Sequence, residues 1–240
     1  MTQSHYFNPD QNLDNEIKII DYTIDRRNFS FITDRGVFSR NKVDYGTNVM
    51  LKTVLRESRD NDSDISGLNN YVKHDKVQET FTEQIEDKAM KCLDLGCGYG
   101  AVSIVLNTIF PEQKWYATDI NPRAVELTKR NSKKFGLDIT AIESDGIPES
   151  LTSSNGSGKR IKFDLVILNP PIRTGKDVYY RLFAEVAEVI NDNGIFYTVI
   201  QKKQGAVSAL KYLQSLFSDV IVADKSGGYH TIRCRTPIPD

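Results

Sequence analysis

The chain has 240 residues and a hydrophobic fraction of 39%, enough for one large α/β domain, or for such a domain plus a small appendage. Its formal net charge of -1 gives no overall positive field that would attract nucleic acid. No apolar run approaches the ~20 residues of a transmembrane helix, and no secretory signal is visible, so we expect a cytoplasmic protein without a membrane partner.

The cysteines and histidines have no spacing typical of a metal site or a disulfide framework. They are Cys92, Cys97, Cys234, His5, His74 and His230. We therefore expect no bound metal, and a reducing compartment in which disulfides are rare.

The N-terminal part reads as a small β appendage with a linking helix, over residues 1–55. Residues 16–24 and 29–33 are strand-like, and turn residues follow them. We expect this appendage to pack on the main sheet. Residues 56–88 carry nine acidic and five basic side chains and predict a polar insertion that leads into a short helix at 77–85. An acidic partner-binding arm is the alternative.

Residues 89–240 form the expected ligand-binding domain, in which short apolar runs alternate with longer amphipathic ones. The predicted strands are 91–95, 114–120, 138–144, 163–168, 194–201, 219–226 and 229–235. The predicted helices are 101–110, 122–136, 178–190 (ended by Asp192-Asn193-Gly194) and 206–217, and 153–159 is a polar loop. This alternation indicates an α/β fold with a seven-stranded, mostly parallel sheet. The short Gly227-Gly228 link requires the last strand to be antiparallel to the one before it.

The segment "LDLGCGYG", residues 93–100, lies where the first of these strands turns into a helix. Gly96, Gly98 and Gly100 allow a tight turn and a close approach of a ligand to the backbone, although a purely structural turn is the alternative. Asp94, inside the strand, disfavours a pyrophosphate ligand and favours one that carries an ammonium and a sulfonium.

Two further acidic residues end the next strands. Asp119 stands where a carboxylate accepts hydrogen bonds from ribose hydroxyls. Asp145 is a candidate for binding an adenine amino group, but an aspartate before glycine is also a common turn residue.

With these residues, the chain resembles the class I S-adenosylmethionine-dependent methyltransferases over residues 90–235. The resemblance implies a Rossmann-like sheet and S-adenosylmethionine as cofactor. It also implies Asp94, Gly96, Gly98 and Gly100 around the methionine moiety, Asp119 on the ribose and Asp145 on the adenine.

The predicted strand 163–168 ends at Asn169-Pro170-Pro171, followed by Ile172. A residue that precedes proline adopts an extended conformation, so we expect a stiff corner at the edge where the ligand binds. The side-chain oxygen of Asn169 and the carbonyl of Pro170 can then accept both hydrogens of one amino or amide nitrogen. The alternative is that the prolines only end the strand.

"NPPI" resembles motif IV of amino-group methyltransferases. Members that act on adenine N6 or on protein glutamine usually have an aromatic residue in the fourth place, where this chain has Ile172. Strings at 5–7, 33–40, 43–47, 169–176 and 199–206 resemble small-domain methyltransferases related to the bacterial 16S ribosomal RNA guanine-N2 enzymes. The larger members carry an additional N-terminal domain with a degenerate methyltransferase fold, which we do not expect in this protein.

That resemblance implies methylation of guanine N2, with ribosomal RNA or the small ribosomal subunit as partner. Basic residues expected near the ligand would hold RNA phosphates while a base is extruded. They are Arg35, Arg40, Arg173, Lys176, Lys202 and Lys203. Phe38 is a candidate for stacking on the base, or else a core residue. The basic residues of helix 122–136 are interpreted as a solvated face.

Four alternatives stay open at this stage. Two are methylation of adenine N6 and methylation of a protein glutamine. The others are a non-catalytic RNA-binding or ribosome-assembly factor on the same scaffold, and a nicotinamide-dependent oxidoreductase, which Asp94 and the Asn-Pro-Pro corner disfavour.

Overall fold

The computed structural model describes residues 16–59, 89–152 and 161–239. Several sequence features lie outside these residues: the string at 5–7, His5, His74, the acidic segment from residue 60 to 88 with its predicted helix, and the loop 153–159. None of the helices in these three ranges combines the length and the hydropathy that a transmembrane span requires.

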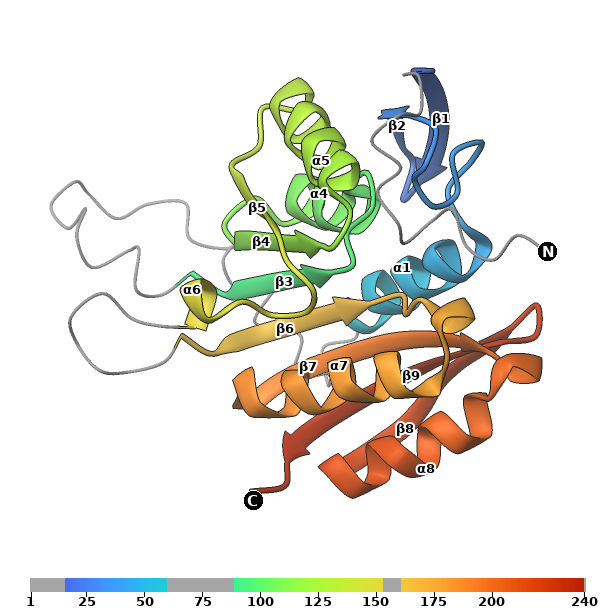
Figure 1. The fold of residues 1–240 in the computed structure, drawn as a ribbon, viewed down its shortest axis with the longest axis vertical. Coiled ribbons are helices and arrows are strands. Elements are labelled where there is room, and N and C mark those ends of the chain that lie inside the picture. Colours follow the sequence, from blue (N-terminus) through green and yellow to red (C-terminus); the bar gives the residue numbers. More distant parts are fainter. Residues whose placement is uncertain (1–15, 60–88, 153–160, 240) are drawn as a thin grey trace, which may run out of the picture.

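A seven-stranded sheet forms the centre of the molecule (Figure 1). Its strands, in spatial order, are β5 (Ile139–Glu143), β4 (Lys114–Asp119), β3 (Lys91–Leu95), β6 (Phe163–Leu168), β7 (Ile190–Gln201), β9 (Tyr229–Pro237) and β8 (Phe217–Ser226). The pairs from β5 to β7 are parallel, whereas β9 runs antiparallel to both β7 and β8. The predicted fold class, a Rossmann-like, mostly parallel sheet with an antiparallel last strand, is confirmed.

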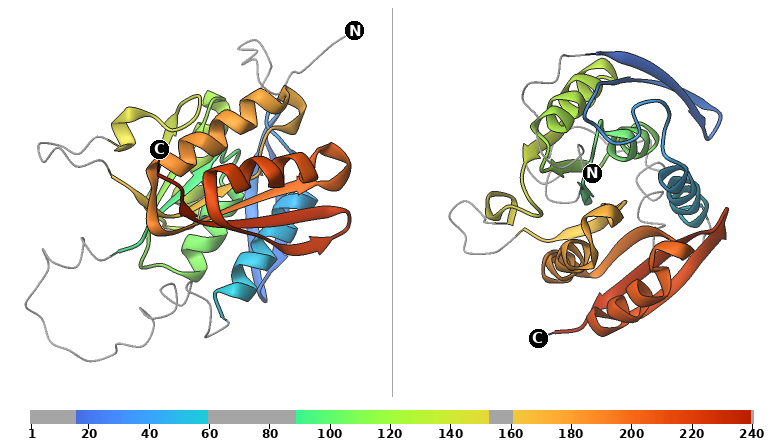
Figure 2. Two further views of the ribbon diagram at one scale, coloured as in Figure 1. Left: turned by 90° about the horizontal axis from the view of Figure 1, so that it is seen from below. Right: turned by 45° about the vertical axis from the view of Figure 1, so that its right-hand side comes forward.

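Helices cover both faces of this sheet (Figure 2). One face carries α1 (Tyr45–Glu57), α4 (Ala101–Ile109) and α5 (Pro122–Lys134). The other carries the short α6 (Glu149–Thr152), α7 (Lys176–Val189) and α8 (Ala206–Leu216). Two 3₁₀ turns, η2 (Ile172–Thr174) and η3 (Lys202–Gln204), precede α7 and α8.

Both ends of the helix α5 are encoded in the local sequence. Pro122 occupies its first turn, and the side chain of Asn121 caps it by accepting a hydrogen bond from the Arg123 backbone N–H at 3.0 Å. Gly136 follows the helix with a φ of 66°, a left-handed conformation that suits glycine at a helix C-terminus.

The end of α7 differs from the prediction. The helix stops at Val189, and β7 begins at Ile190, so the Asp192-Asn193-Gly194 sequence lies within the strand. Ile190 pairs with Phe163, and the Asn191 side-chain nitrogen donates to Asp164 at 2.6 Å. These contacts with β6 draw the segment into the sheet at the cost of an irregular register.

The N-terminal appendage is a hairpin of β1 (Lys18–Ile24) and β2 (Arg27–Thr33), followed by α1. We expected it to pack on the sheet. Instead β2 lies against α5: the Asn131 side chain exchanges two hydrogen bonds with the backbone of Ile32, and Phe31 contacts the ring of Phe135. The sheet itself is contacted by α1, through β7, β8 and β9. The helix extends to Glu57, past the predicted division at residue 55, and the domain limits stay predictions.

Candidate active site

A cavity of about 550 Å³ opens at the carboxyl ends of the central strands. It lies where β3 and β6 adjoin and the strand order reverses, which is the usual ligand position in such sheets. Most of the candidate site residues line it: Phe38, Asp94, Gly96, Gly98, Asp119, Asp145, Asn169, Pro170, Pro171, Ile172 and Arg173. Gly100, Lys176 and Lys202 are not among the lining residues.

The glycine loop connects β3 to α4 with left-handed backbone at its glycines. Gly98 has a φ of 58°, and a Cβ there would meet no atom within 4 Å, so this glycine leaves the cavity side open. Gly100 differs, because a Cβ there would come within 2.9 Å of the Ile104 side chain and 3.1 Å of Thr128. Gly100 therefore allows the start of α4 to pack closely on its neighbours.

The amides of this loop are bound within the protein. Those of Gly96 and Cys97 both donate to the Thr118 carbonyl, at 2.8 and 2.9 Å. The Gly98 amide donates to the carboxylate of Asp119 at 2.8 Å. A phosphate-binding loop needs such amides free for the anion. The bound amides therefore disfavour a dinucleotide pyrophosphate at this place.

Asp94 is buried at the N-terminus of α4, with 3% of its surface exposed. Its carboxylate accepts a hydrogen bond from the Ser103 backbone N–H at 3.0 Å. Burial raises the pKa of Asp94 to about 6; the Ser103 hydrogen bonds lower it and the charge of Asp119 raises it further. A cationic ligand would stabilise the charged form of this carboxylate.

Asp119 ends β4 and holds the glycine loop from the other side. One oxygen accepts from Gly98, and the other accepts from the Asn121 backbone N–H at 2.9 Å. Burial raises the pKa of Asp119, and these two hydrogen bonds oppose the rise. Each carboxylate oxygen has a second lone pair that can accept a further hydrogen bond, for example from a ribose hydroxyl.

Asp145 lies at the cavity wall, but its carboxylate is exposed and forms an ion pair with Arg181 at 2.5 Å. Arg181 also pairs with Glu185, and Glu185 accepts from the Ile147 backbone N–H at 3.0 Å. The helix α7 thus holds the loop after β5 in place through these side chains.

The Asn169-Pro170-Pro171 corner is a tight turn at the end of β6. The Ile172 N–H donates to the Pro170 carbonyl at 2.8 Å, and Pro171 has φ -75° and ψ 71°, the geometry of an inverse γ-turn. One lone pair of the Pro170 carbonyl is therefore used within the turn, which leaves one for a ligand.

Asn169 contacts the N-terminus of α1. Its side-chain nitrogen donates to the Thr47 hydroxyl at 2.8 Å and to the carboxylate of Asp44 at 3.2 Å. Asp44 caps α1 by accepting from the Thr47 backbone N–H at 3.1 Å. Asp44 and Thr47 both line the cavity.

Aromatic side chains lie at the mouth of the cavity. Phe38 and Tyr229 line it, and Tyr45 packs against Tyr229 with a ring-centroid distance of 5.5 Å. Phe38 is 54% exposed, so it is not a core residue.

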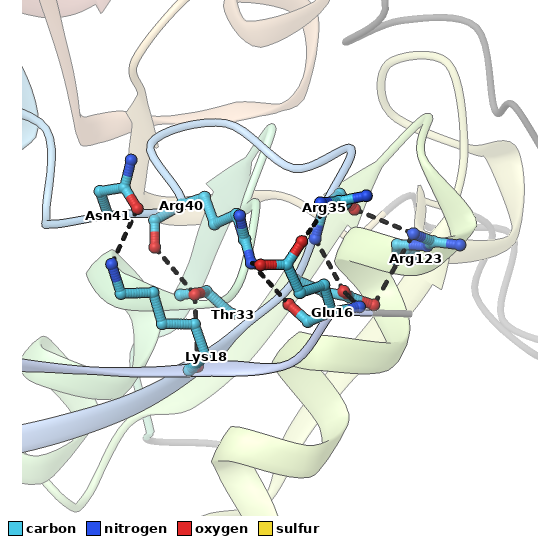
Figure 3. A network of polar contacts seen from close by, with 8 residues as sticks. Glu16, Lys18, Thr33, Arg35, Arg40, Asn41 and Arg123 are labelled. Carbon is cyan, nitrogen blue, oxygen red and sulfur yellow. Dashed lines mark hydrogen bonds and ion pairs between the residues drawn. The ribbon is translucent and has the colours of Figure 1, made fainter. Parts of the chain in front are cut away.

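The basic residues fall into two groups. Arg35 and Arg40 both pair with Glu16 in the N-terminal network shown in Figure 3, to which Arg123 also belongs. Arg123 lies 3.7 Å from the carboxylate of Asp34. A second group, on η2, the start of α7 and η3, is exposed: Arg173, Lys176, Lys202 and Lys203. The backbone N–H of Lys202 donates to the Gly228 carbonyl at 2.7 Å, which fixes η3 to the β8–β9 turn.

The described residues contain no group of three or more histidine, cysteine or acidic side chains that could hold a metal. Cys92, Cys97 and Cys234 are buried free thiols.

Sequence reasoning missed Asp44, Thr47, Arg181 and Tyr229. The D-x-x-T spacing of Asp44 and Thr47 signals a helix cap, which would have located the start of α1. Nothing in the local sequence connects that cap to Asn169, 125 positions from Asp44.

The methyltransferase small domain family model matches residues 64–233. Among curated proteins, the uncharacterized protein YbxB of Bacillus subtilis is 29% identical over 96% of this chain and 98% of its own length. Ribosomal RNA small subunit methyltransferase C of Pasteurella multocida is 30% identical over 63% of this chain. This chain spans only 34% of that protein's length.

Among solved structures, the T. thermophilus 16S rRNA N2 methyltransferase RsmC, in complex with AdoMet and guanosine, matches with a TM-score of 0.70. The match has 19% sequence identity and covers 92% of this chain and 50% of that one, so it supports the fold alone.

Proposed function

Because this chain belongs to the methyltransferase small domain family, we propose that it methylates guanine N2 in 16S ribosomal RNA, using S-adenosylmethionine. Membership of this family makes the chain an S-adenosylmethionine-dependent methyltransferase, and the substrates of the family are ribosomal RNA and proteins. We propose guanine N2 as the target within that range.

The cavity residues suit this cofactor. Gly96 and Gly98 would border the methionine moiety, and Asp94 would offset its positive charges from within the protein. Asp119 would accept hydrogen bonds from the ribose, and Asp145, with Arg181 beside it, would border the adenine. When bound, the cofactor supplies an electrophilic methyl group on a positively charged sulfur.

The corner at Asn169 provides the chemistry for an amino-group acceptor. The Asn169 side-chain oxygen and the Pro170 carbonyl would accept the two hydrogens of the target nitrogen. This draws the lone pair of the nitrogen out of conjugation with the ring and orients it for in-line attack. No strong general base is needed, since the proton can leave to water after transfer.

Ile172 favours guanine over the alternatives of adenine N6 and protein glutamine. Members of those branches usually have an aromatic residue at this place, which stacks on the target, whereas Ile172 is aliphatic and only partly buried. Phe38 at the cavity mouth would take over the stacking. The name of the P. multocida relative agrees with a ribosomal RNA target.

We further propose that the partner is ribosomal RNA or the small ribosomal subunit, in the cytoplasm. The exposed basic residues Arg173, Lys176, Lys202 and Lys203 stand beside or near the cavity and would bind the RNA backbone. A guanine in a single-stranded or splayed region is the more accessible target.

The observation that carries the proposal is that Asp44 and Thr47 hold the side-chain nitrogen of Asn169 and leave its oxygen available, in a cavity that the buried Asp94 also lines. The test is transfer of a labelled methyl group to 16S ribosomal RNA, to small subunits and to a glutamine-containing release factor. Digestion and mass spectrometry then identify the product.

We expect N2-methylguanosine, and a matching loss of this nucleoside from ribosomal RNA of a deletion strain. N6-methyladenosine or methylglutamine as the product would replace the guanine assignment with the corresponding alternative. Binding of RNA without transfer by protein that binds the cofactor would establish the non-catalytic alternative.

A further inference from the structure

Both hydrogens of the Asn169 side-chain nitrogen have acceptors in the protein. The Thr47 hydroxyl lies at 2.8 Å and the Asp44 carboxylate at 3.2 Å. A primary amide has two donors on nitrogen and an acceptor oxygen. The described structure therefore uses the donor end of this side chain completely and leaves its oxygen for the cavity that Asn169 lines.

Charge determines which end of the amide faces Asp44. A carboxylate can only accept hydrogen bonds, so the Asn169 oxygen turned toward it would meet a negative charge without a hydrogen between them. The opposite orientation of the amide would also present N–H groups to the target amino group, which likewise carries hydrogens. Asp44 thus excludes the orientation that could not activate the target.

The N-terminus of α1 holds Asp44 in place for this contact. The carboxylate oxygen that binds Asn169 also accepts from the Thr47 backbone N–H, as a helix cap. Gly46 leaves room beside it, because a Cβ at this position would lie 3.0 Å from both that oxygen and the ring of Tyr229. The cap, the amide and Tyr229 form one packed group at the cavity wall.

We propose that Asp44 and Thr47 are positioning residues of the transfer reaction: they fix the Asn169 amide so that its oxygen accepts a hydrogen of the target amino group. The inference rests on the proposed function. It assigns a role in the reaction to α1, which precedes the glycine loop in the sequence and contributes no residue to it.

The test exchanges charge between the two positions. In the Asn169→Asp variant, two carboxylates face each other, and we expect turnover to fall more than 100-fold. Asp44→Asn alone keeps an acceptor and a good helix cap, so it should cost less than tenfold. In the Asn169→Asp background, Asp44→Asn removes the repulsion and should raise turnover at least tenfold.

Asp44→Asn is thus expected to lower turnover in the wild-type background and to raise it in the Asn169→Asp background. This opposite effect distinguishes positioning from a purely structural role. If Asp44 only capped the helix, Asp44→Asn would change turnover by the same factor in both backgrounds, and that result would overturn the inference. Thr47→Val, which loses the acceptor at nearly constant volume, should lower kcat five- to thirtyfold, and Thr47→Ser should restore it. Cofactor affinity should stay within about twofold throughout.

A matched control removes a hydrogen bond of α1 that does not involve Asn169. Tyr22 donates to Asn48 at 2.9 Å, and neither residue lines the cavity. Tyr22→Phe should leave kcat unchanged; a loss as large as that of Thr47→Val would indicate a general effect of loosening α1 and would also overturn the inference.

The urea midpoint of the ligand-free variants gives a readout that does not depend on activity. Asn169→Asp should lower the midpoint, and Asp44→Asn should restore it only in that background. If Asp44→Asn restores the urea midpoint only in the Asn169→Asp background, while wild-type protein methylates none of the substrates, the proposed function is refuted and the contact is supported. If wild-type protein is active and neither turnover nor midpoints show the reversal, the inference fails and the proposed function stands.

Discussion

The carboxylate of Asp94 and the backbone N–H of Ser103 are joined by a hydrogen bond of 3.0 Å, so β3 caps the helix that follows it. The positive end of α4 is thereby occupied by a negative charge that belongs to the protein. Proteins that bind dinucleotides place the phosphates of the ligand at this position. A ligand here is instead selected for positive charge.

The pH dependence of cofactor affinity follows from the same carboxylate. In the free protein, the pKa of Asp94 is raised to about 6 by burial. A bound cation favours the charged form and lowers this pKa, so affinity increases as pH rises toward 6 and levels off above it. We expect S-adenosylmethionine to bind about tenfold more weakly at pH 5 than at pH 7, measured by calorimetry.

The Asp94→Asn variant is the control for this dependence, since it should bind weakly and equally at both pH values. The stability of the ligand-free wild-type protein changes with pH in the direction opposite to that of its cofactor affinity. The raised pKa makes the ligand-free wild-type protein lose stability as pH rises from about 4 to 6, and the variant should not show this loss. Unchanged pH profiles in the variant would remove Asp94 from the cofactor site.

Replacement of Asp119 by alanine should weaken the cofactor by about 1–3 kcal/mol, the scale of hydrogen bonds to a charged group. Part of this loss reflects the glycine loop, whose Gly98 amide loses its acceptor. Glu143 pairs with Asp119 across β4 and β5 but is exposed and does not line the cavity. Glu143→Ala should bind normally, and equal affinity of the two variants would contradict the ribose role.

Replacement of Asn169 by alanine should separate turnover from cofactor binding. Because its contact is to the target, kcat should fall by about 10²–10³, the usual cost of one preorganised polar contact to the reacting group. The cofactor dissociation constant should change by less than about twofold. Single-turnover kinetics with calorimetry measures both, and a parallel loss of the two would place Asn169 in the cofactor site instead.

The exposed basic residues beside the cavity should contribute to RNA affinity through phosphate contacts. Arg173→Ala and Lys202→Ala should each weaken binding and reduce the slope of log affinity against log salt by about 1. Lys129 and Arg130, exposed on α5 and absent from the cavity lining, provide matched controls. A slope that falls equally with the α5 variants would mean that the RNA lies elsewhere.

The arginines of the appendage are expected to behave differently. Arg40 pairs with Glu16 at 2.7 Å and also donates to its backbone carbonyl at 3.0 Å. Figure 3 shows these contacts within the N-terminal network, to which Arg35 also belongs. Our expectation that Arg35 and Arg40 bind RNA stays a prediction that now competes with a structural role.

The sheet could be predicted because its signals are local. Apart from Asp164, the run 163–168 is apolar, and Asn169 and two prolines follow it. Pro122 and Gly136 mark the two ends of α5. The start of β7 could not, because Asn191 joins the sheet through a hydrogen bond to Asp164, 27 residues away. Local turn chemistry at Asp192-Asn193-Gly194 was overridden by this tertiary contact.

The residues of the candidate site likewise fall into those that local sequence indicates and those that depend on distant contacts. Asp94, Asp119 and Asn169 were recognisable because each ends a strand or lies in it at a characteristic place. The roles of Asp44 and Tyr229 depend on packing between segments that are far apart in the sequence, which no spacing encodes. The ion pair of Asp145 with Arg181, 36 residues away, is a further case.

The insertion of β9 between β7 and β8 has a consequence for the emerging chain. Tyr229, its first residue, completes the wall to which the cap at Asp44 contributes. During synthesis, the residues around the cofactor and the Asn169 amide are made before Tyr229. The wall of the pocket is therefore completed only once β9 is made, and the same strand joins β8 to the rest of the sheet, because β8 pairs with β9 and not with β7.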